Sequence, residues 1–87
     1  DADFWEQVNL RSIHLIMLTM PSHQDMIEVV KQIRRKNFTG KIAGIAKYED
    51  QRKELIDMGV DVAFNFYAEA GAGFAEESLH LLENRIA

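Results

Sequence analysis

The feature that most constrains this fold is a regular alternation of short apolar runs with amphipathic segments. Three runs rich in Ile, Leu, Val, Ala and Phe are typical of strands: 12–19, 41–47 and 61–66. Three segments carry apolar residues at helical spacing among charged ones: 23–36, 49–58 and 68–87. Strands that alternate with helices through short connections pair in parallel, with right-handed crossovers. The sequence therefore predicts an α/β fold in which a three-stranded parallel sheet has flanking helices.

Local signals mark where the predicted elements begin and end. Pro21 ends the first strand, and Ser22 is a suitable N-cap for the helix that follows. Gly59 falls where a left-handed residue commonly ends a helix.

The apolar run 12–19 lacks strict alternation of polar and apolar residues, so we expect it to form a central strand that is buried on both sheet faces. Gly44 and its alanine neighbours let a helix or a ligand approach the second strand closely. A capping-box spacing predicts a short opening helix over 3–8.

Length, charge and composition exclude several classes of protein. The 87 residues suffice for one small domain, and the absence of cysteine rules out disulfide and thiolate chemistry. The net charge is −4 and the basic run 31–36 occupies one helix end, so we expect no nucleic-acid partner. The apolar run 15–18 is far shorter than the roughly 20 residues that cross a bilayer, so we expect no membrane insertion. The first ten residues are acidic and polar, unlike a signal peptide, which favours the cytoplasm.

The titratable residues form no catalytic or metal-binding pattern. His14, His23 and His80 lack the i, i+4 spacing that places two metal ligands on one helical face. His23 differs from the other two because it lies just beyond the carboxyl end of a strand, where open α/β sheets bind ligands. The acidic residues of segment 49–57 alternate with Arg and Lys, which is typical of a solvated face. We therefore expect no catalytic residue, no bound metal and no enzyme activity.

A pair of closely spaced glycines follows the third predicted strand. The sequence Gly71-Ala-Gly73 resembles the start of a dinucleotide fingerprint, but Glu76 occupies the third glycine position. An acidic side chain there does not allow close packing of a helix on the sheet. The motif therefore favours a flexible strand-to-helix corner over an anion-binding turn.

Two segments, 15–21 and 55–61, resemble those of receiver domains of two-component signalling. In a receiver domain, the phosphoacceptor aspartate would fall near Thr19 and the switch Ser or Thr near Ala46. The lysine that pairs with the phosphorylated product would fall near Asn65 or Phe66. Without a carboxylate to phosphorylate or a lysine to pair with the product, a working receiver is excluded. A degenerate relative of that family is not excluded.

A different family accounts for more of the chain. The segments that carry the likeness are Ile-His-Leu-Ile-Met-Leu-Thr-Met-Pro-Ser-His, Gly-Lys-Ile-Ala-Gly-Ile-Ala-Lys-Tyr, Glu-Leu-Ile-Asp-Met-Gly-Val-Asp and Phe-Tyr-Ala-Glu-Ala-Gly-Ala-Gly-Phe-Ala-Glu. They resemble the TrkA-N domain, also called the regulator of potassium conductance, of the kind attached to bacterial glutathione-regulated potassium/proton antiporters. The resemblance matches the second half of that domain. We therefore expect 1–87 to be a partial nucleotide-binding regulatory domain whose amino-terminal glycine-rich half is absent.

The resemblance implies a cytoplasmic Rossmann-like domain that binds NAD(H) or another adenine nucleotide and forms a homodimer. It also implies that the domain passes its ligand state to a membrane-embedded potassium transporter, which attaches it to the inner membrane. The cofactor-binding positions that it implies are Thr19, Met20, Pro21, His23 and Lys47. Segment 68–87 matches the crossover helix through which family members pair. Because most phosphate contacts come from the glycine-rich turn, we expect these 87 residues alone to bind no nucleotide.

Two alternatives remain open at this point. The chain can be part of an NAD-dependent dehydrogenase, although no residue here is a convincing proton donor. It can also be a dimerisation element that uses the last helix and binds no ligand.

Overall fold

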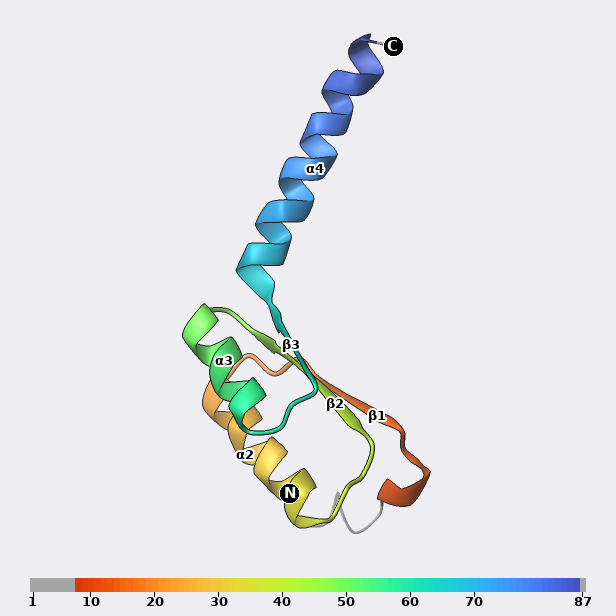
Figure 1. Cartoon of the computed structure of the whole chain (residues 1–87), viewed down its shortest axis with the longest axis vertical. Helices are drawn as coiled ribbons and strands as arrows, with labels where there is room; N and C mark the ends of the chain where they lie inside the picture. The colour runs from red at the N-terminus through yellow and green to blue at the C-terminus, as the bar shows by residue number, and fades with distance from the viewer. Residues whose placement is uncertain (1–7, 87) are drawn as a thin grey trace.

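The computed structural model describes residues 8–86 and confirms the predicted fold class (Figure 1). The elements follow in the order η1 (Leu10–Ser12), β1 (Leu15–Leu18), α2 (His23–Arg35), β2 (Lys41–Ala46), α3 (Glu49–Asp57), β3 (Val62–Asn65) and α4 (Phe66–Ile86). All but one of the residues of the predicted opening helix, 3–8, lie outside the described part of the chain.

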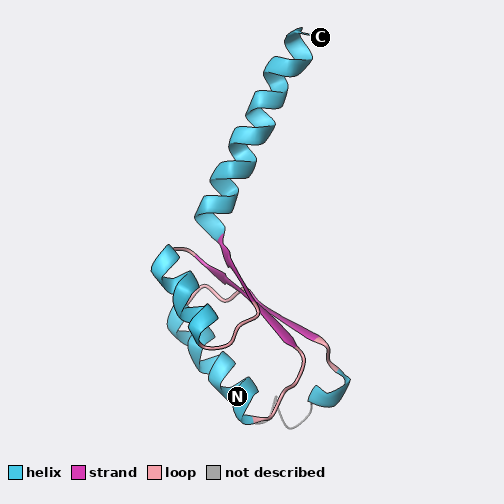
Figure 2. Ribbon diagram, viewed as in Figure 1, coloured by secondary structure: helices cyan, strands magenta, loops and turns pink. Residues whose placement is uncertain are grey.

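The three strands form one parallel sheet in the order β1-β2-β3. Helices α2 and α3 are the two crossovers, and both lie on the same face of the sheet (Figure 2). The prediction that 12–19 forms a central strand is wrong within the described residues, because β1 is at the edge and β2 is central. Two successive crossovers of the same hand that step in the same direction put both helices on one face.

The core lies between this covered face and the two helices. Ser22 begins α2 as predicted, since its Oγ accepts a hydrogen bond from the Asp25 amide at 3.2 Å. The fully or nearly buried residues come from both layers: Leu18, Met26, Ile27, Val30, Ile33, Phe38, Ile42, Ala46, Leu55 and Val60. Gly44 allows α3 to approach β2, because a Cβ at this position would lie 3.3 Å from Cδ1 of Leu55. Gly59 adopts the predicted left-handed conformation, with φ of 96°.

The opposite face of the sheet is apolar and exposed. Met17 of β1 is 70% exposed, and Val62 of β3 is 59% exposed. Strand register places these side chains on the same face as Ala43 of β2. The prediction that the first strand is buried on both faces is therefore wrong for the described residues. Its unbroken apolar run fits two covered faces, whereas both helices cover only one.

Helix α4 begins directly after β3, two residues earlier than predicted, and projects away from the sheet (Figure 1). The molecule is elongated as a result, with extents of 57 × 27 × 19 Å. Gly71 and Gly73 lie inside this helix, and the prediction of a flexible corner at these glycines is wrong. The corner falls at Asn65 and Phe66, because the Asn65 side chain caps the first turn by accepting a hydrogen bond from the Ala68 amide at 3.1 Å.

Candidate functional site

A pocket of about 390 Å³ lies beyond the carboxyl ends of the strands, between the loops that lead into α2 and α3 and the start of α4. The structure brings together around it all the cofactor-binding positions that the resemblance implied: Thr19, Met20, Pro21, His23 and Lys47. This placement follows from the topology, because the carboxyl ends of parallel strands meet at one edge of the sheet. The volume lies within the range of about 300–1,000 Å³ that small-molecule sites occupy.

Sequence reasoning missed the rest of the pocket wall. The additional lining residues are Met26, Ile45, Ala46, Tyr48, Gln51 and Phe66. The two aromatic residues could have been found, since Tyr48 directly follows the predicted strand 41–47 and Phe66 is the last residue of the predicted strand 61–66. Met26 and Gln51 come from the first turns of helices that flank the pocket. The wall is thus largely apolar and aromatic, with a few polar groups, as is usual for sites that bind small organic ligands.

His23 joins the two helices at the pocket. Its Nε2 lies 2.8 Å from Oε1 of Glu54, so an Nε2–H group donates a hydrogen bond from α2 to the Glu54 carboxylate of α3. Its Nδ1 is buried and has no hydrogen-bond partner among residues 8–86. The His23–Glu54 contact thus joins the first turn of α2 to α3 beside the pocket.

A second polar cluster fixes the junction between α3 and α4. Arg52 donates to both oxygens of Glu49, at distances from 2.7 to 3.0 Å. Asn65 donates from Nδ2 to Oε2 of the same carboxylate at 3.3 Å, while its Oδ1 caps α4. The hydrogen bonds from Arg52 and then from Asn65 lower the pKa of Glu49 from its ordinary value of 4.5 to about 2. The i, i+3 spacing of Glu49 and Arg52 was visible in the sequence, but the contact with Asn65 was not.

The Glu49 cluster predicts a pH dependence of stability. Because the folded-state pKa is lowered, the stabilisation is present above about pH 4.5 and is lost as the pH falls toward 2. We expect Glu49→Gln to lower the urea midpoint at pH 6, and we expect the difference from the wild type to shrink steadily between pH 4.5 and pH 2. Glu76→Gln, on the exposed surface of α4, is the control and should show no such convergence. A difference that stays constant over this pH range would contradict the assignment.

The pocket wall presents polar groups as well as apolar ones. Residues 8–86 contain no group of three His, Asp or Glu side chains placed to hold a metal ion. Thr19, Lys47 and Gln51 offer a hydroxyl, an ammonium and an amide to a ligand. No protein-family model matches the chain, and a comparison with curated proteins found no match either. Within the described residues, none of the helices has the length and apolar character that crossing a bilayer requires.

Proposed function

We propose that this chain is part of a cytoplasmic regulatory domain that binds NAD(H) or another adenine nucleotide and controls a potassium efflux or potassium/proton antiport system. The observation that carries the proposal is the convergence of Thr19, His23 and Lys47 at one pocket, at the sheet edge where nucleotide-binding α/β domains bind their ligands. The proposed role is ligand-dependent gating of cation transport, and no catalytic step is assigned to the site.

The pocket accounts for how an adenosine group would be held. Tyr48 and Phe66 supply aromatic rings, and Met20 supplies a polarisable apolar side chain, against which a planar base stacks favourably. Lys47 is exposed at the rim, where its ammonium can pair with a phosphate. The sequence led us to expect no nucleotide binding by these 87 residues alone, and that expectation stays untested. We propose instead that the chain by itself binds AMP weakly, with Kd on the order of 1 mM, because the pocket could hold the base whereas the glycine-rich turn that would make most phosphate contacts is absent from the sequence.

The proposed partners are a second copy of the chain and a membrane-embedded potassium transporter in the parent protein. Helix α4 supports the first, because Phe74, Leu79 and Leu82 are each more than half exposed along it. A long helix whose apolar residues face water is marginal in isolation and gains stability when a partner covers them. The open sheet face supports assembly as well, since parallel sheets are normally covered on both faces. A ligand would bias the transporter through its different affinities for two arrangements of the paired domains.

The exposure of α4 also favours a second candidate function, a dimerisation element that binds no ligand. The two candidates differ in one measurement. AMP titrated into the isotope-labelled chain should shift the amide signals of Thr19 and Lys47 if the pocket is a nucleotide site. Signals that do not move at 10 mM AMP, roughly ten times the expected Kd, would favour the dimerisation element.

Lys47 provides the sharper test of nucleotide binding. We expect Lys47→Gln to weaken AMP binding about ten-fold, because loss of one charged hydrogen bond costs roughly 1.5 kcal/mol. The binding of adenosine, which has no phosphate, should hardly change. The control is Lys31→Gln, which removes the same charge from an exposed position on α2 that is not part of the pocket wall. Equal losses for AMP and adenosine, or equal losses in the two variants, would rule out a phosphate contact at Lys47.

A further inference from the structure

One end of the molecule is strongly basic, although the chain as a whole is acidic. The segment 29–48 contains six of the ten lysines and arginines and none of the 14 acidic residues. All of the six but Lys47 belong to the second half of α2, its C-cap or the start of β2. These parts lie at the end of the molecule away from α4 (Figure 1). The proposed function gives this concentration of positive charge no role.

We call four exposed side chains at this end the basic end: Arg11, Arg35, Lys36 and Lys41. They come from η1, the end of α2 and the start of β2. The Lys41 amide donates to the His14 carbonyl at 2.8 Å, which holds the residues after η1 beside the start of β2. Arg34 donates to the Phe38 carbonyl at 3.2 Å and so fixes the turn between α2 and β2. The four cations are therefore carried by ordered backbone on neighbouring segments.

The protein leaves most of this charge unpaired. The side chains of Arg11, Arg35 and Lys36 form no ion pair within residues 8–86. The side chain of Lys41 is 75% exposed, and its ammonium lies 3.9 Å from Oδ1 of Asp61. Cations at the end of a helix favour its macrodipole, which accounts for Arg35 and Lys36. It does not account for Arg11 and Lys41, which lie outside the helix.

The acidic residues of α2 and α4 lie away from the basic end. On α2, Asp25 and Glu28 belong to the first half of the helix. Helix α4 carries four acidic residues between Glu69 and Glu83. The molecule is 57 Å long, whereas charges in water are screened over about 8 Å at physiological ionic strength. A charged surface that touches the basic end therefore interacts with its cations and hardly at all with the acidic residues of α4.

We propose that the basic end binds the surface of an anionic phospholipid membrane. Clusters of four or more Lys and Arg on an amphipathic helix are typical of surfaces that bind anionic lipids. In the link 36–40, Asn37 and Thr39 are exposed, whereas the ring of Phe38 is buried. The link thus offers neither an aromatic ring for a nucleic-acid base nor an apolar anchor for a protein partner. The choice of lipid rests on the proposed function, because a domain that controls a membrane transporter works beside a bilayer.

Binding of this kind is peripheral and sets an orientation. The basic end has long charged side chains but no exposed apolar one to insert into the bilayer, so attraction between charges holds it. The pocket lies at the opposite, carboxyl edge of the sheet, and α4 extends beyond it. A chain that rests on its basic end therefore keeps the pocket open to the solution.

Co-sedimentation with vesicles tests the proposal. In low salt, we expect the chain to bind vesicles of equal parts phosphatidylglycerol and phosphatidylcholine and not to bind vesicles of phosphatidylcholine alone. The binding should disappear in about 1 M salt, where the screening length falls to about 3 Å. Binding that persists in high salt, or that is equal for the two kinds of vesicle, overturns the proposal. Binding to double-stranded DNA of random sequence without binding to anionic vesicles overturns it too.

Two variants with the same change in net charge show whether the basic end is the contact. Each cation near an anionic surface adds about five-fold to binding, so the double variant Arg35→Gln with Lys36→Gln should bind about 25-fold more weakly. Lys53→Glu, on the exposed surface of α3, also lowers the net charge by two and should bind nearly as the wild type does. Circular dichroism checks that both variants keep their helices. Equal losses in the two variants contradict a contact at the basic end.

The absence of cysteine allows the orientation to be measured separately. Thr39→Cys places one thiol beside the basic end, and Glu77→Cys places one on α4, both at exposed positions. With a polarity-sensitive dye on each thiol, anionic vesicles should shift the emission of the label at 39 and leave that of the label at 77 unchanged. Equal shifts at both positions overturn the proposal. Vesicle binding without AMP binding removes the proposed nucleotide site and leaves this inference standing, whereas AMP binding without vesicle binding does the reverse.

Discussion

Ile42→Ala should cost about 2–5 kcal/mol in the free energy of unfolding, the range for large-to-small changes at fully buried aliphatic positions. Ile42 is 0% exposed in the central strand, on the face that α2 and α3 cover. Small domains are stable by only about 5–15 kcal/mol, so this one substitution removes a large share of the total. Urea denaturation followed by circular dichroism measures the loss.

Met17→Ala is the matched control for this experiment. Met17 lies on the neighbouring strand β1, but it is on the open face and is 70% exposed. Substitutions at such exposed positions usually change stability by about 0.5 kcal/mol or less. Losses of equal size at Ile42 and Met17 would show that both faces are covered in solution, and they would contradict the one-sided sheet.

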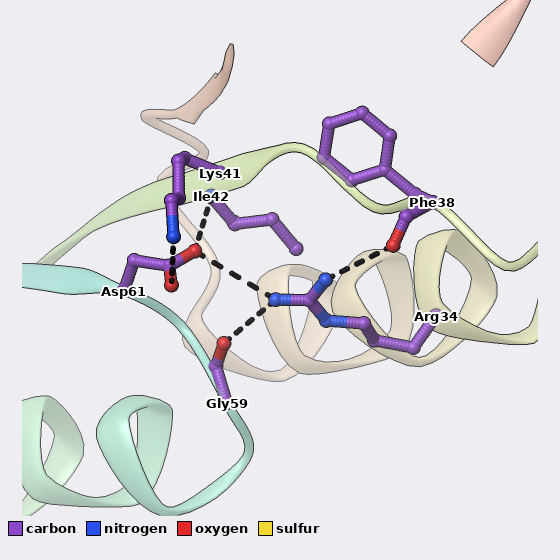
Figure 3. A network of polar contacts seen from close by, with 6 residues as sticks. All are labelled: Arg34, Phe38, Lys41, Ile42, Gly59 and Asp61. Atoms are coloured by element: carbon purple, nitrogen blue, oxygen red, sulfur yellow. Dashed lines mark hydrogen bonds and ion pairs between the residues drawn. The ribbon is translucent and has the colours of Figure 1, made fainter. Parts of the chain in front are cut away.

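Arg34→Met should have the next largest effect, a loss of about 2 kcal/mol, because it removes hydrogen bonds from a charged donor that joins three segments. Figure 3 shows the Arg34 guanidinium between the end of α2 and the start of β3. It donates to the Phe38 carbonyl at 3.2 Å and to the Gly59 carbonyl at 2.8 Å, and it lies 3.7 Å from Oδ2 of Asp61. The Asp61 carboxylate in turn accepts a hydrogen bond from the Ile42 amide at 2.8 Å.

Methionine keeps most of the apolar stem of arginine, so Arg34→Met removes mainly the polar contacts. Arg35→Met is the matched control, because Arg35 is the exposed next residue of the same helix. We expect it to change the free energy of unfolding by less than about 0.5 kcal/mol. Similar losses in the two variants would show that the network in Figure 3 adds nothing beyond the general effect of charge.

The order and type of the elements were predictable because they depend on neighbours in the sequence. Ser22 as N-cap and Gly59 as left-handed terminator act through backbone groups a few residues away. The convergence of Thr19, His23 and Lys47 was also within reach, since parallel pairing brings the residues after each strand to one edge. The resemblance to a nucleotide-binding family named these positions, and the topology explains why they meet.

The predictions that proved wrong concern interactions between distant parts of the chain. An apolar run such as 15–18 shows that side chains avoid water, but it does not say which face a helix covers. The expected corner at Gly71 was misplaced because glycine permits a bend without requiring one, and the cap from Asn65 to Ala68 begins the helix earlier. The link between Glu49 and Asn65 joins residues whose proximity depends on the packing of α3 beside β3.

The sequence by itself determined the alternation of strands and helices, their caps and the edge of the sheet at which the pocket residues collect. Each follows from local backbone chemistry and from the parallel pairing of strands that alternate with helices. Only the tertiary structure decided that both crossover helices cover one face, that β2 is the central strand and that α4 leaves the body at a junction of three aromatic rings. These outcomes depend on the summed packing free energy of side chains far apart in the chain, which no local pattern contains.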